Sequence, residues 1–237
     1  MQEVISGTST ILIYFIVAAG TALGCRCFIK IPNELFRKIL HGILLGSLFI
    51  FIFAFDTWWI VALEAVAFAI IVYPILMFFE GFKGFSQLTT ERKAGELKKS
   101  LLLVFFMFAT VVIVCWGWMG DKYLVLASVS AWGFGDAAAA MIGKRFGKHK
   151  ITWRYTDGMK SLEGSLAMFV VSMISVAIVL LIRGGLNLVG YVVVSSVVAL
   201  VSAVAELYSK GGNDTVICPV SAMVVLLPLL YLFGGLA

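Results

Sequence analysis

The chain has 237 residues, of which 62% are hydrophobic and 13% charged, and its formal net charge is +5. Soluble domains carry about 25% charged residues, so this composition excludes a soluble globular domain. Eight membrane-spanning helices of about 20 residues each would use about 160 residues. The remainder is too short for a separate soluble catalytic domain, so we expect the chemistry to lie on the spans and their connections.

Apolar runs of spanning length, cut at polar breaks, predict eight transmembrane helices. They are expected at approximately 8–25, 39–55, 57–79, 100–119, 123–142, 162–182, 186–208 and 216–236. We therefore predict an all-α fold, a polytopic integral membrane helix bundle that forms a single domain over residues 1–237.

The basic residues predict how the bundle is oriented in the membrane. With the N-terminus outside, 16 of the 18 Lys and Arg residues fall in cytoplasmic loops, and Lys122 and Arg183 remain outside. Short cytoplasmic loops are enriched in Lys and Arg, so this distribution supports both the eight spans and the orientation.

An ionisable residue in the predicted fifth span is the first candidate for a functional group. Asp136 lies beside small residues that recur every four positions, Gly135, Ala139, Gly143 and Gly147. Such a stripe lets a neighbouring helix approach closely. The aspartate is either a hydrogen-bonded carboxylate in a tight helix pair or a functional group, because ionisable residues inside a bilayer are costly.

A basic loop follows this span and leads into the sixth. A helix N-terminus beside cationic side chains is suited to phosphate oxygens, although a solvated loop with a capped helix has the same pattern. The candidates for phosphate contacts are Lys144, Arg145, Lys148, Lys160 and Ser161. Glu163 lies three residues after Lys160, hence on the same helix face.

A further acidic pair lies at the end of the predicted seventh span and in its connection to the eighth. Asp214 is expected at the same membrane face as Asp136 and Glu163, and three carboxylates there could hold Mg²⁺ on a polyphosphate. Asp214 could equally cap a helix, and Glu206 could pair with Lys210 one turn later.

Two weaker signals lie nearer the N-terminus. Arg37, Lys38 and His41 open the predicted second span, where they could contact phosphate or act as snorkelling anchors. Glu96 follows a glycine just before the fourth span.

Together these segments resemble the membrane-embedded CTP-dependent lipid-alcohol kinases, the family of dolichol, phytol and farnesol kinases with the related CTP-using diacylglycerol kinase. The resemblance rests on Arg37-Lys38-x-x-His41, Gly95-Glu96, Gly135-Asp136-Ala137-x-Ala139 with Gly143 and Gly147, Lys160-Ser161-x-Glu163-Gly164-Ser165, Glu206, and Gly212-x-Asp214-Thr215-x-x-x-Pro219. Family members more often have Asp-Asn where this chain has Asp214-Thr215.

The resemblance implies transfer of the γ-phosphoryl group of CTP to the hydroxyl of a membrane lipid, at the cytoplasmic face of the bilayer and without nucleic acid. It implies Asp136, Lys160 and Glu163 as catalytic residues and Asp136, Glu163 and Asp214 as Mg²⁺ ligands. The triphosphate would contact Lys144, Arg145, Lys148, Lys160, Ser161, Arg37, Lys38 and His41. Supporting roles would fall to Glu96, Gly135, Gly143, Gly164 and Glu206.

Two other functions fit parts of the pattern. A CTP:phosphatidate cytidylyltransferase would use the same nucleotide, metal and membrane face, but that family has an Asp-rich signature near its C-terminal end, whereas the Asp136 block is central. A small transporter would need acidic groups at the bilayer midplane and inverted repeats. Here the acidic candidates gather toward one face and no repeat is visible.

Overall fold

The computed structural model describes residues 1–80, 95–152, 160–210 and 212–235. Within these ranges the regular elements are helical, apart from one isolated β-bridge between Lys150 and Ser161. Eight helices in the described part of the chain are long and apolar enough to cross a membrane. The prediction of an all-α, polytopic helix bundle is therefore confirmed.

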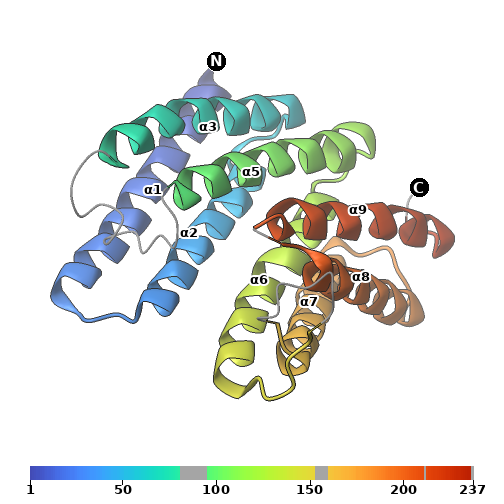
Figure 1. Cartoon of the computed structure of the whole chain (residues 1–237). Helices are drawn as coiled ribbons and strands as arrows, with labels where there is room; N and C mark the ends of the chain where they lie inside the picture. Colours follow the sequence, from blue (N-terminus) through green and yellow to red (C-terminus); the bar gives the residue numbers. More distant parts are fainter. Residues whose placement is uncertain (81–94, 153–159, 211, 236–237) are drawn as a thin grey trace. The chain divides into compact units, whose positions relative to one another are not determined.

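The chain divides into two compact units, Met1–Ile113 and Val114–Ala237. The expectation of a single domain over residues 1–237 stays a prediction. The helices of the first unit, drawn in blue to green in Figure 1, are α1 (Gln2–Phe28), α2 (Asn33–Ala54), α3 (Trp58–Glu80) and α5 (Glu96–Val111).

Aromatic side chains fill the centre of the first unit. The ring of Phe51 on α2 is fully buried, and its centroid lies 5.7 Å from that of Phe105 and 5.8 Å from that of Phe108 on α5. At one end of the unit, the Glu3 carboxylate accepts hydrogen bonds from the backbone N–H of Asp56 and Thr57. These groups precede α3, so a side chain of α1 satisfies donors at the start of another helix.

A π-helix, η1 (Val112–Trp118), connects the two units in sequence. The second unit then continues through the helices α6 (Lys122–Phe146), α7 (Leu162–Arg183), α8 (Leu188–Tyr208) and α9 (Asp214–Leu232). Three of these helices have side-chain N-caps. Asp121 accepts from Tyr123 N at 2.8 Å, Ser161 from Gly164 N at 3.2 Å, and Asn187 from Gly190 N at 2.7 Å. Such caps fix where each helix begins, because they satisfy amides that lack a partner within the helix.

Several helices begin earlier than the apolar runs. α1 begins at Gln2 rather than at position 8, and α2 begins at Asn33 rather than at position 39. The residue before α2 is Pro32, whose fixed φ suits the entry to a helix. A helix ends where its backbone is capped, whereas an apolar run ends where the side chains become polar, so the two boundaries differ.

Candidate active site

The close packing of α6 against α7 is the framework of the candidate site. A Cβ atom added at Gly135 would lie 2.2 Å from Ser172 Oγ, and one added at Gly164 would lie 3.3 Å from Gly143 Cα and 3.0 Å from Ala139 O. These distances leave no room for larger residues without movement of the neighbour. The small-residue stripe of α6 therefore faces α7, as expected for a tight helix pair.

A short antiparallel backbone ladder joins the two ends of the loop between α6 and α7. Lys150 and Ser161 form a β-bridge, and the N–H of Ile151 donates to Lys160 O at 3.0 Å. The N–H of Leu162 donates to His149 O at 2.9 Å. The ladder holds the end of α6 beside the start of α7. Part of the predicted basic loop, including Arg154, lies outside the described residues.

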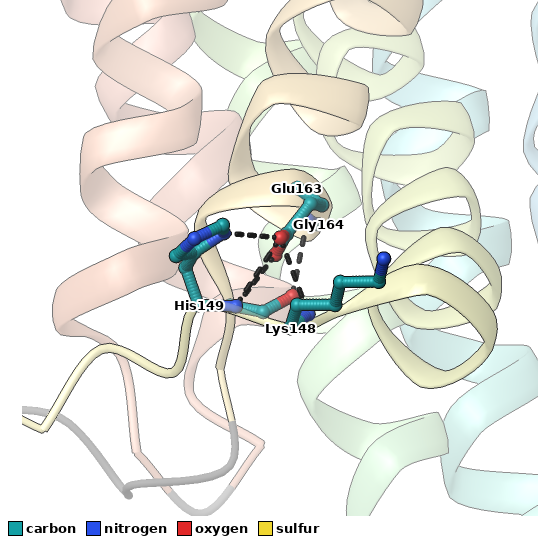
Figure 2. Close-up of polar contacts among 5 residues, drawn as sticks. Lys148, His149, Glu163 and Gly164 are labelled. Atoms are coloured by element: carbon teal, nitrogen blue, oxygen red, sulfur yellow. Dashed lines mark hydrogen bonds and ion pairs between the residues drawn. The ribbon is translucent and has the colours of Figure 1, made fainter.

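The Glu163 carboxylate holds the segment that follows α6. It accepts the backbone N–H of Lys148 at 3.2 Å and that of His149 at 3.2 and 3.3 Å. The same carboxylate is hydrogen-bonded to the imidazole of His149, with 2.7 Å between Nδ1 and Oε1 (Figure 2). Glu163 is thus engaged by protein donors in the first turn of α7.

Lys160 is fixed at the C-terminal end of α8. Its ammonium lies 3.1 Å from Glu206 Oε1 and donates to the backbone oxygens of Glu206 and Ser209. Only 14% of the Lys160 side chain and 11% of the Glu206 side chain are exposed. An ammonium has three donors, and these three oxygens account for all of them; Ser209 Oγ lies further away, at 3.4 Å. The lysine predicted to bind the triphosphate thus ties the start of α7 to the end of α8.

Three acidic residues on α6, α8 and α9 share the electrostatic environment of this lysine. We call Asp136, Lys160, Glu206 and Asp214 the charged cluster. Lys160, Asp136 and Asp214 all act electrostatically on the Glu206 carboxylate. All four cluster members also act on the buried Cys218, which lies one turn after Asp214 on α9. The fold therefore brings together three of the acidic candidates and one basic candidate.

The described residues contain no group of three or more His, Cys, Asp and Glu side chains arranged to hold a metal ion. The expected set of Asp136, Glu163 and Asp214 is therefore not preassembled, and Glu163 is occupied by Lys148 and His149. A magnesium ion carried by nucleotide phosphates needs only one or two protein carboxylates. A role for Asp136 and Asp214 as ligands of such an ion stays a prediction.

The remaining basic candidates of this unit lie at the surface. Lys144 and Arg145, in the last turn of α6, and Lys148 after it are all exposed. The Arg145 guanidinium lies 5.3 Å from the centroid of the Phe146 ring. Ser161, in contrast, is buried, and its hydroxyl caps α7. Its predicted contact with phosphate stays a prediction.

The candidates nearer the N-terminus belong to the first unit. Arg37, Lys38 and His41 lie in the first three turns of α2 and are half-buried, and Arg37 forms an ion pair with Glu34 at 2.6 Å. Glu96 is the first residue of α5, and its side chain lies outside the described residues. A role for these residues in nucleotide binding stays a prediction.

The structure adds two residues that the sequence did not single out. His149 contacts Glu163, and Ser209 contacts Lys160. One indication of His149 was present in the sequence, its position next to Lys148 in the basic loop. No indication of Ser209 was present.

No protein-family model matches the chain. Over 107 residues the chain is 32% identical to a phytol kinase from Synechocystis sp., a stretch that covers 45% of this chain and 44% of that protein. The chain thus matches less than half of the length of this relative. The similarity supports a general relationship with a lipid kinase.

Proposed function

We propose that this protein is a membrane lipid kinase that transfers the γ-phosphoryl group of CTP to the hydroxyl of a membrane lipid alcohol. The observation that carries the proposal is the charged cluster of the second unit, whose Asp136 lies on α6, the helix that ends in the exposed cations Lys144 and Arg145 and is followed by the exposed Lys148. Similarity to a phytol kinase supports a lipid alcohol as the acceptor. The motif resemblance supports CTP as the donor and the cytoplasmic face as the location.

The reaction sets the requirements for such a site. The acceptor oxygen forms a new bond to the γ-phosphorus, and the bond from that phosphorus to the β–γ bridging oxygen breaks. CDP leaves with the electron pair, and the hydroxyl proton passes to a base. Catalysis of this kind is mostly positioning and stabilisation of charge. It needs cations around the phosphates and a carboxylate near the acceptor.

The residues of the second unit can be assigned to these tasks. Lys144, Arg145 and Lys148 would contact the phosphates, since their exposed side chains are accessible to a nucleotide. Asp136 and Asp214 would hold a magnesium ion, which when bound neutralises phosphate charge. Alternatively, Asp136 would act as the base that receives the hydroxyl proton. The contacts of Lys160 support a positioning role, because it holds the start of α7 against α8.

A labelling experiment tests the proposal. Purified protein is incubated with Mg²⁺, CTP labelled on either the γ- or the α-phosphate, and a panel of lipid alcohols, diacylglycerol and phosphatidate. We expect only the γ label to enter the lipid phase, and the productive acceptor identifies the substrate. Transfer of the α label with release of pyrophosphate would contradict the proposal and indicate a cytidylyltransferase. Asp136→Asn serves as the inactive control.

A further inference from the structure

The imidazole of His149 is held in one orientation by a single carboxylate. Its Nδ1 lies 2.7 Å from Glu163 Oε1, and the backbone N–H of His149 donates to both oxygens of the same carboxylate. Ring and backbone are therefore fixed by the same group (Figure 2). The backbone bonds alone would anchor the loop, so the added ring contact chiefly orients the imidazole.

This orientation leaves a defined atom pointing away from the carboxylate. An ionised carboxylate can only accept hydrogen bonds, so the neutral ring carries its hydrogen on Nδ1 and a lone pair on Nε2. The His149 side chain is 77% exposed, and none of the hydrogen bonds within the described residues uses Nε2. The outer edge of the ring is thus an accessible hydrogen-bond acceptor.

Exposed apolar side chains lie on the first turns of α7 and at the end of α6, on either side of the segment that carries this acceptor. Leu162, whose N–H donates to His149 O at 2.9 Å, is 59% exposed, and Leu166 one turn later is 61% exposed. Phe146, at the end of α6, is also exposed. In a membrane-spanning helix, exposed apolar side chains face lipid. A lipid lying along α7 would therefore have its head group close to the start of this helix.

The two reactants, the nucleotide and the lipid alcohol, differ in whether they can donate a hydrogen bond to Nε2. Phosphate oxygens are acceptors and do not pair with a lone pair. The hydroxyl of the lipid is a donor, and it is attached to an apolar tail that suits Leu162 and Leu166. We propose that His149, oriented by Glu163, is a substrate-contacting residue whose Nε2 accepts a hydrogen bond from the hydroxyl of the lipid alcohol and, in place of Asp136, receives its proton when the oxygen attacks the γ-phosphorus. This inference rests on the proposed kinase function and names the residue that places the acceptor.

Two substitutions of the same residue separate this role from loop anchoring. In His149→Asn, the amide nitrogen can still donate to Glu163, but nothing replaces Nε2. In His149→Gln, the longer side chain places an amide oxygen near the position of Nε2 and gives up the short contact with the carboxylate. Thr152→Ala, at a nearby exposed position, is the control.

The test measures γ-phosphoryl transfer with the lipid alcohol and with CTP varied in turn. We expect His149→Asn to lower kcat/KM for the lipid about 100-fold, the scale of a misplaced reactant. The KM for CTP and the thermal unfolding midpoint should stay at the wild-type values, and His149→Gln should recover part of the loss. The opposite order, with a lower kcat/KM for the lipid in His149→Gln than in His149→Asn, would show that the ring only anchors the loop. A selective rise in the KM for CTP would place His149 on the nucleotide and overturn the inference.

The same measurements distinguish the two proposals. If the wild-type protein transfers the γ label and His149→Asn is indistinguishable from it, the role of His149 is refuted while the kinase function stands. If the wild-type protein transfers no γ label, the kinase function fails, and the role of His149 fails with it.

Discussion

Replacement of Lys160 by methionine is expected to destabilise the second unit more than any other single change at the charged cluster. The substitution removes the ammonium and leaves the Glu206 carboxylate, 11% exposed, without its partner at 3.1 Å. It also removes the donor to the backbone oxygens of Glu206 and Ser209, which end α8. Removing one partner of a buried ion pair costs about 3–5 kcal/mol. We therefore expect a loss of about 3–5 kcal/mol in the free energy of unfolding.

The partner substitution is expected to be milder. Glu206→Gln removes the charge but keeps both backbone oxygens, and an amide oxygen can still accept from Lys160. A hydrogen bond to a charged group contributes about 1.5–3 kcal/mol, so we expect a loss in that range. The double variant should lose less than the two single losses together, with a coupling energy of about 1–3 kcal/mol.

Unfolding by SDS in mixed micelles, followed by tryptophan fluorescence, measures these differences for the four proteins of the double-mutant cycle. Arg183→Met combined with Lys160→Met is the matched control. Arg183 pairs with Asp121 at 2.5 Å, at the opposite end of α7. The control pair should be additive within about 0.5 kcal/mol, because the sites share no partner. Additivity of Lys160→Met and Glu206→Gln within the same margin would refute the coupling derived from the structure.

Three further outcomes are expected. Gly135→Ala should destabilise the second unit by about 1–3 kcal/mol in the same SDS assay, because the added Cβ would lie 2.2 Å from Ser172 Oγ. The control Gly24→Ala should be neutral or slightly stabilising, because no atom lies within 4 Å of its added Cβ. Asp136→Asn should abolish γ-phosphoryl transfer while size-exclusion chromatography shows an unchanged profile, and near-normal turnover would remove this residue from the mechanism. Arg183→Met should lower the thermal unfolding midpoint yet leave kcat for lipid phosphorylation at the wild-type value; a large fall in kcat would show that this end of α7 also shapes the site.

The spans were predictable because hydropathy over about 20 residues reports a local property, the transfer of a helix into lipid. The stripe from Gly135 to Gly147 was predictable for a similar reason, since residues four apart share a helix face. The helix that packs against this stripe, α7, could not be predicted. The stripe shows that a neighbouring helix can approach closely, but it does not identify that helix.

The contacts of the candidate site depend on residues far apart in the chain. Lys160 meets Glu206 and Ser209 across 46 and 49 positions, and Glu163 meets His149 across 14. The short-range alternative was pairing of Glu206 with Lys210, four residues later. Helix periodicity predicts only such pairs, between residues three or four apart on one helix. Pairing across helices depends on which helices are neighbours, and this information is absent from local patterns.

The pairing of α6 with α7 bears on how the protein enters the membrane. α6 is the least apolar of the eight candidate spans and contains Asp136, whereas α7 is the most apolar. An aspartate at the centre of a span costs about 2.5–3.5 kcal/mol during insertion by the translocon. Because the small-residue face of α6 packs directly on α7, the two spans can leave the translocon together as a helical hairpin. During biogenesis the most apolar span would thus carry its polar neighbour into the bilayer before α8 and α9 have been synthesised.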